Sequence, residues 1–137
     1  MISTLEFQKA VFAQLSLDAT LTALIPATSI VDAADHDGMP VLRIGDITEG
    51  NADLTYDQSY TTLIANFHCF TKETGKIANA EIMKRVRTLM ESGFNPTMTG
   101  FNMCGLRFDT VRFMRDADDS DICHGVLSYD ILMEATE

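Results

Sequence analysis

The chain has 137 residues, of which 46% are hydrophobic and 22% are charged, the composition of a globular protein rather than of a disordered segment. This length predicts a single domain over residues 1–137. The formal net charge of −10 argues against simple binding to nucleic acid or to an anionic membrane, because phosphate neutralisation requires clustered Lys and Arg.

The first quarter of the chain predicts two helices. The sequence STLE at residues 3–6 is typical of a capping box, in which the serine bonds an early helical amide and the glutamate bonds the serine amide. Apolar residues then recur at helical spacing as far as Leu15. Asp18 is the predicted N-cap of a short helix over residues 19–25, which ends before Pro26.

Strand patterns follow between residues 29 and 71. A short strand is expected over residues 29–33, and a second over residues 41–47, directly after a proline that a strand tolerates at its start. Residues 60–71 (YTTLIANFHCFT) are rich in β-branched and aromatic side chains and give the strongest strand pattern. The polar segment over residues 50–58 is predicted to be a loop.

The second half of the chain predicts a long helix and two strands. Residues 76–92 carry one apolar stripe, formed by Ala78, Ile82, Val86, Leu89 and Met90. Residues 94–105 form a connector with room for a short strand. The alternation over residues 106–115 slips at Thr110, which indicates a β-bulge, and residues 127–134 alternate cleanly as a half-buried final strand.

This order of elements predicts an α+β fold. We expect a mainly antiparallel mixed sheet packed against an N-terminal helix pair and one long central helix.

Charge is distributed unevenly along the sequence. Residues 1–71 carry Lys9 and Arg43 against nine acids, residues 72–115 carry eight bases against four acids, and residues 116–137 carry seven acids and no base. Such a layout could let copies of the chain dock with opposite charges facing. An uneven solvated surface explains it equally well.

Arg107, Arg112 and Arg115 are candidate interface residues on the strand over residues 106–115. They could form ion pairs with carboxylates of a neighbouring subunit, or with Asp130 or Glu134 of the same subunit. The sequence leaves both readings open.

The loop over residues 50–58 is longer than a hairpin requires. Asp53, Leu54 and Tyr56 are candidate contact residues within it, because two apolar side chains stand out in a polar segment. A mobile loop with two incidental apolar residues is the alternative.

The densest polar cluster is RDADDSDICHG at residues 115–125. A calcium loop starting at Asp116 would have Asp121 where a glycine is needed and Leu127 where a bidentate glutamate is needed. The spacing of Cys and His residues also fits no zinc motif. A metal-binding module over residues 116–124 is therefore a remote alternative, and the aspartates are better explained as turn residues and a docking edge that includes Asp118, Asp119 and His124.

The amino terminus and the cysteines favour synthesis in the cytoplasm. Residues 1–7 carry an acidic and no basic side chain, unlike a secretory signal. Cys69, Cys104 and Cys123 are odd in number and lack framework spacing, so we expect reduced thiols buried as small hydrophobic side chains. No catalytic motif is present.

Nearly the whole chain resembles the tail completion, or tail terminator, proteins of long-tailed phages and gene transfer agents. The resemblance lies in three stretches: FQKAVFAQLSLDATLTALI at residues 7–25, MPVLRIGDIT at residues 39–48 with the strand and helix over residues 61–90, and LRFDTVRFMRDADDSDICHGVLSYDILME at residues 106–134.

The resemblance implies a structural virion protein without cofactor or catalysis. It would form a hexameric ring at the head-proximal end of the tail, made in the host cytoplasm. Tail-tube and neck (stopper) proteins are the implied partners, DNA would pass through the ring without specific binding, and no membrane is involved. Another neck component, such as a head-closure protein, or a tail-tube-like subunit is the main alternative.

Overall fold

The computed structural model describes residues 2–32, 39–52, 56, 59–116 and 118–136. The described elements are α1 (Thr4–Ser16), α2 (Ala19–Leu24), a 3-10 turn (Ala27–Ser29), β1 (Ile30–Val31), β2 (Val41–Asn51), β3 (Tyr60–Lys72), α3 (Ile77–Glu91), β4 (Phe101–Arg115) and β5 (Ile122–Ala135). None of the helices in these segments is long and apolar enough to cross a membrane.

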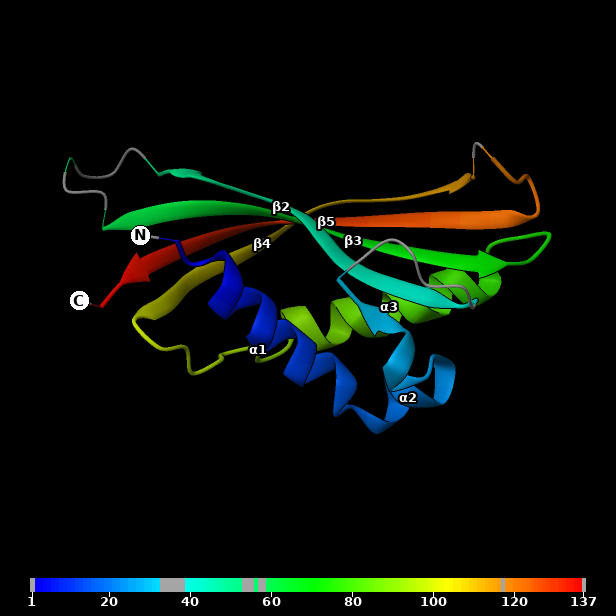
Figure 1. The fold of residues 1–137 in the computed structure, drawn as a ribbon, viewed down its shortest axis with the longest axis horizontal. Helices are drawn as coiled ribbons and strands as arrows, with labels where there is room; N and C mark the ends of the chain where they lie inside the picture. The colour runs from blue at the N-terminus through cyan, green and yellow to red at the C-terminus, as the bar shows by residue number, and fades with distance from the viewer. Residues whose placement is uncertain (1, 33–38, 53–55, 57–58, 117, 137) are drawn as a thin grey trace.

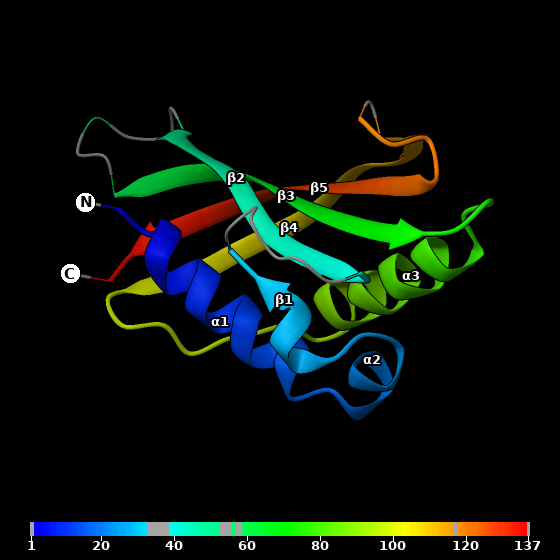
Figure 2. The ribbon, with the colours of Figure 1, turned by 45° about the vertical axis from the view of Figure 1, so that its right-hand side comes forward.

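The strands form one twisted sheet in the order β1-β2-β3-β5-β4, parallel between β1 and β2 and antiparallel elsewhere. The described helices all lie against one face of this sheet, and the opposite face, called the open face below, is free of them (Figure 1, Figure 2). The predicted α+β fold is confirmed. Side chains at the core between helices and sheet include Phe7, Val11, Leu15, Leu21, Leu63, Phe67, Leu127, Tyr129 and Met133.

Two strands are longer than the sequence patterns indicate. β2 continues through Gly50 and Asn51, which were expected in the loop, because both residues pair with β3. β4 begins at Phe101, and its register against β5 shifts twice, at 103–105 and at 108–110. The second shift confirms the predicted bulge at Thr110. The shift at 103–105 reverses which side chains face the core. The residues before it therefore do not continue the alternation that predicts a strand over residues 106–115.

The start of α1 is held by a carboxylate from β2 rather than by a capping box. The side chain of Ser3, the N-cap, makes no capping hydrogen bond. The Ser3 amide and hydroxyl donate to Glu49 Oε2 at 2.9 and 3.1 Å, and the Thr4 amide and hydroxyl donate to Oε1 at 3.1 and 2.6 Å. The capping box expected at residues 3–6 is therefore wrong, because Glu49 takes the place expected for Glu6.

Asp18 joins the short helix to the long one. Its carboxylate accepts the Leu21 amide at 2.8 Å, which confirms the predicted N-cap of α2. The Arg85 guanidinium of α3 donates two further hydrogen bonds to it, each 2.9 Å long. These bonds from Arg85 hold the pKa of the Asp18 carboxyl below its usual range.

The inward face of α3 contains a buried polar residue. Ile82, Val86 and Met90 are buried as predicted, whereas Ala78 is exposed and Asn79 is buried in its stead. The Asn79 amide donates to backbone carbonyls of β3 and β5, so it replaces an apolar contact with hydrogen bonds to two strands.

Candidate functional site

The candidate residues from the sequence lie at three separate places. Tyr56 stands between β2 and β3 at one end of the sheet, with its side chain fully exposed. Asp53 and Leu54 fall outside the described residues. The β4–β5 hairpin occupies the other end (Figure 1). Arg107, Arg112 and His124 lie on the open face, as the alternation of β4 and β5 places them.

The hairpin tip is organised by backbone hydrogen bonds. The Asp119 carboxylate accepts the Asp121 amide at 3.0 Å, and its carbonyl accepts the Ile122 amide at 3.1 Å, as expected of a turn residue. Arg115 donates to the carbonyl oxygens of Glu73 and Gly75 and so ties the hairpin to the turn before α3. Arg115 therefore stabilises the fold of its own subunit. Asp118, one residue before Asp119, lies at this tip.

The basic and acidic stretches of the sequence lie side by side. β4 pairs with β5 along its whole length, and Arg107 forms an ion pair with Asp130 of β5 in the same subunit. The Arg112 side chain is exposed, and no ion pair or side-chain hydrogen bond joins it to another described residue. The acidic residues of β5 therefore lie beside the basic residues of β4 within one subunit.

His124 belongs to a hydrogen-bonded chain on the open face. Its Nε2 lies 2.9 Å from Nδ1 of His68, and Nε2 of His68 lies 2.8 Å from Oδ2 of Asp46. The Asp46 carboxylate can only accept, so the Nε2 atom of His68 carries a proton. When His68 is neutral, its Nδ1 accepts a hydrogen bond from the Nε2–H group of His124, so the hydrogen-bonded chain fixes the tautomer of His68.

A β-bulge places the carboxylate of this chain. The register of β2 against β3 shifts between Gly45 and Ile47, and Asp46 in between has a φ of +56°. Aspartate tolerates this left-handed conformation better than most residues. The extra residue keeps Ile47 on the core side and leaves the Asp46 carboxylate beside His68.

Aromatic and cationic groups surround the two histidines. The Phe70 ring stacks on His124 with centroids 4.3 Å apart, and the Arg43 guanidinium lies 6.0 Å from the Phe70 centroid. We call Arg43, Asp46, His68, Phe70 and His124 the open-face cluster.

The open-face cluster does not resemble a catalytic site. Hydrogen bonds occupy both ring nitrogens of His68. Cys123 is buried on the helix side of the sheet, so it points away from His124, and burial raises the pKa of its thiol. Within the described segments, no three His, Cys, Asp or Glu side chains are grouped to hold a metal ion. The metal-binding alternative for residues 116–124 gains no support from this arrangement.

The three cysteines do not share one environment. Cys69 and Cys123 are buried as expected, and burial raises the pKa of Cys69 to about 12. Cys104 is exposed, contrary to the prediction, because the first shift in register lies at its position in the edge strand β4.

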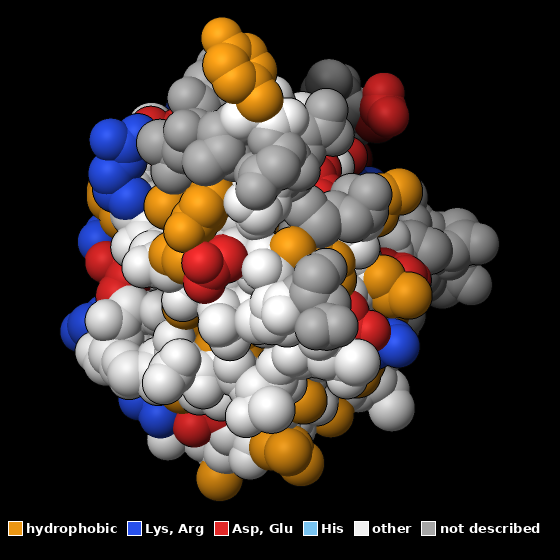
Figure 3. Space-filling view, turned by 90° about the vertical axis from the view of Figure 1, so that its left-hand side faces the viewer, with side chains coloured by type: hydrophobic (Ala, Val, Ile, Leu, Met, Phe, Trp, Pro, Cys, Tyr) orange, Lys and Arg blue, Asp and Glu red, His pale blue; other side chains and the backbone are white. Residues whose placement is uncertain are grey.

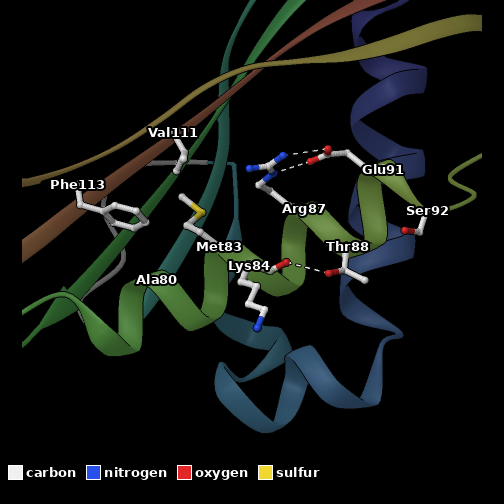
Figure 4. Close-up of a pocket in the computed structure, with 9 residues that line it drawn as sticks. All are labelled: Ala80, Met83, Lys84, Arg87, Thr88, Glu91, Ser92, Val111 and Phe113. Atoms are coloured by element: carbon white, nitrogen blue, oxygen red, sulfur yellow. Dashed lines mark hydrogen bonds and ion pairs between the residues drawn. The ribbon is translucent and has the colours of Figure 1, made fainter.

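A groove of about 460 Å³ separates α3 from the edge strand β4 (Figure 4). Arg87 crosses it, donating to Glu91 at 2.6 and 3.1 Å with its guanidinium 3.7 Å from the Phe108 ring centroid. This bidentate pair raises the pKa of Arg87 and lowers that of Glu91. The groove is lined by Ala80, Met83, Lys84, Arg87, Thr88, Glu91, Ser92, Val111 and Phe113.

Comparison with known proteins identifies the family. The model of the family "Tail completion protein gp17" matches residues 9–134, which is most of the chain. The chain belongs to this family. Tail completion is a structural role, so the family is not enzymatic.

Solved structures show the same fold. A protein chain from the virion of a native gene transfer agent particle superposes with a TM-score of 0.77 at 19% sequence identity, covering 96% of this chain and 97% of that chain. A search of curated proteins returned no match.

Sequence reasoning missed most of the open-face cluster of this tail completion protein. His124 is the one candidate site residue in this cluster, whereas Asp46 and His68 lie within the predicted strands over residues 41–47 and 60–71 and are not candidates. The signal that could have found His68 is a polar side chain in the otherwise apolar strand pattern of residues 60–71. No local sequence pattern shows that β3 pairs with β5 in the register that places His68 beside His124.

The open-face cluster should make this tail completion protein less stable in mild acid. Burial lowers the pKa of His68 below its ordinary value of 6.5, with Arg43 adding to this and Asp46 opposing it. Burial likewise lowers the pKa of His124, together with His68, Arg43 and Arg112 and against Asp116. Below pH 6.5 the unfolded chain binds more protons than the native one, so the free energy of unfolding should fall as the pH decreases.

Urea denaturation at a series of pH values from about 7.5 to about 5 measures this loss, at roughly 1.4 kcal/mol for each pKa unit of depression. The matched control is His68→Gln/His124→Gln, which keeps polar side chains but cannot titrate. Its stability should change less over this pH range. An equal slope in both proteins would contradict the assignment.

Proposed function

We propose that this protein caps the head-proximal end of the phage tail tube as a hexameric ring, ends tube polymerisation and forms the interface to the neck. Membership of the tail completion family supports this role. The similarity in fold to a protein of a gene transfer agent virion also supports a place in a virion.

The observation that carries the proposal is the difference between the two ends of the sheet. At one end, where β2 ends and β3 begins, Tyr56 is fully exposed. At the other end, the β4–β5 hairpin carries Asp116, Asp118, Asp119 and Asp121 (Figure 1). A cap contacts the tube on one side and the neck on the other, so it requires two chemically unlike ends. A subunit that only repeats along a tube requires ends that fit each other.

DNA would cross such a ring without specific binding. The net charge of −10 repels phosphate, and a lumen of the same sign would let the duplex slide through without adhering.

A tube-length assay tests the function. Purified tail-tube subunits are polymerised with increasing amounts of this protein, and tube lengths are measured by electron microscopy. We expect shorter tubes with added density at one end. Longer tubes with this protein along their length would indicate a tube-like subunit. Unchanged tubes, with binding only to a neck protein, would indicate a stopper or head-closure component.

Two variants assign the ends of the subunit. Tyr56→Ser and Asp118→Asn/Asp119→Asn each alter one end of the sheet and touch no core contact. If the cap has unlike ends, one variant should weaken tube capping and the other should leave capping intact. Equal effects of both variants would contradict the assignment of one end to the tube.

A further inference from the structure

We propose that neighbouring copies of this chain dock head to tail, with the outer side of α1 of one copy seated in the groove between α3 and β4 of the next. This contact rests on the proposed ring and names the two surfaces that would build it.

The edge strand β4 leaves one side of the core incompletely covered. The inward side chains of β5 from Cys123 to Met133 are buried, whereas each inward side chain of β4 remains partly accessible. The reason is the sheet order, in which β4 has a neighbour on one side only. These partly accessible apolar side chains are Phe101, Met103, Leu106, Phe108, Val111 and Phe113.

The groove offers an apolar floor with a basic residue on its α3 rim. Figure 4 shows Val111 and Phe113 of β4 facing Met83 of α3 across it. Lys84 stands on the α3 rim of the groove. It has no ion-pair partner among the residues that the structure describes.

Helix α1 has the complementary shape, a second apolar side that its own subunit does not cover. Phe7, Val11 and Leu15 face the core. Leu5 and Phe12 are 58% and 40% exposed, and their spacing of seven residues puts them on the same side of the helix. A helix of this kind binds grooves through residues one and two turns apart.

Charge complementarity selects a second copy of this chain as the occupant. The charged residues that line the groove are Lys84 and Arg87 against Glu91, a surplus of one positive charge. On the outer side of α1, Glu6 and Asp32 against Lys9 leave a surplus of one negative charge. Figure 3 shows basic side chains gathered along one margin of the molecule and sparse along the opposite margin.

The positions of the two surfaces allow a closed assembly. β1 lies beside α1 at one edge of the sheet, and β4 forms the other edge. A contact between different surfaces at opposite edges is heterologous, and repeating it closes a ring when the rotation permits.

Two variants, each defective on one surface, test the contact. Phe12→Asp removes the apolar ridge of α1, and Lys84→Glu reverses the charge on the α3 rim of the groove. Each should weaken self-association in sedimentation by about tenfold or more. An equimolar mixture should form dimers and stop there, because only one pair of intact surfaces remains. Ile64→Asp on the open face, 43% exposed, is the control and should associate like the unaltered chain.

Cross-linking tests the same contact if copies of the chain associate only on the end of the tail tube and not in solution. Phe12 is replaced by p-benzoylphenylalanine, and the protein is irradiated at high concentration and on tail tubes. Cross-links to residues 77–91 or 101–115 of another copy are expected. Cross-links elsewhere, or none between copies, would overturn the contact.

The two proposals fail separately. Tubes that are capped equally well by both defective variants, with no such cross-link, would remove this contact and leave the capping function standing. Cross-linked copies that leave tube length unchanged would do the opposite.

Discussion

Gly125→Ala should lower the free energy of unfolding by about 3 kcal/mol, the effect of overpacking combined with the loss of buried hydrogen bonds. A Cβ atom at this position in β5 would lie 2.3 Å from Oδ1 of Asn79. Asn79 is fully buried, and its Nδ2 donates to the carbonyl oxygens of Cys69 at 2.9 Å and Cys123 at 3.0 Å. The side chain cannot retreat without giving up these bonds.

A double-mutant cycle isolates this clash. Asn79→Ala alone should cost about 2–3 kcal/mol, because two buried strand carbonyls lose their donor. In the double variant Asn79→Ala/Gly125→Ala, the clashing atom is gone, so the combined cost should be well below the sum. Urea denaturation measures all four proteins. Gly105→Ala in β4, where an added Cβ meets no atom within 4 Å, is the control and should change stability little. Additive costs would contradict the proposed clash.

Glu49→Ala should lower the free energy of unfolding by about 2 kcal/mol. Its carboxylate accepts hydrogen bonds from the amides and hydroxyls of Ser3 and Thr4, and without it the first amides of α1 lose their partner. Because α1 supplies Phe7 and Val11 to the core, fraying at its start should loosen the packing against β2.

This stabilisation should disappear in acid. Burial alone raises the pKa of the Glu49 carboxyl, but the hydrogen bonds from Thr4 and Ser3 together outweigh it, so the pKa lies below its ordinary value of 4.5. The contribution is therefore full above about pH 4.5 and is lost as the pH falls through the native pKa.

Glu6→Ala is the matched control for Glu49→Ala. Glu6 makes an ion pair with Lys9 at 3.8 Å on the surface of α1, which is expected to contribute less than about 0.5 kcal/mol. A larger cost for Glu6→Ala than for Glu49→Ala, measured by urea denaturation, would restore the capping box as the feature that starts the helix.

The candidate interface residues show the limit of reading charge from a linear sequence. Arg107, Arg112 and Arg115 look alike in the sequence, yet their surroundings in the fold differ completely. Arg107 pairs with Asp130, Arg115 donates to backbone carbonyls near α3, and Arg112 has no charged partner among the described residues. Only Arg112 therefore remains available for a contact between subunits, because the register of β4 decides which arginine meets a carboxylate of β5.

The sequence by itself determined the features that depend on neighbouring residues. Helical spacing located α1 and α3, Asp18 marked the start of α2, and the broken alternation at Thr110 located a bulge, because turn chemistry and side-chain periodicity are local.

Only the tertiary structure decided the features that join distant segments. Glu49 reaches the start of α1 from 46 residues away, Asn79 reaches two strands, and Asp46 meets His68 and, through it, His124. These contacts depend on strand order and register, which arise from packing the whole sheet against the helices and leave no periodic trace in the chain.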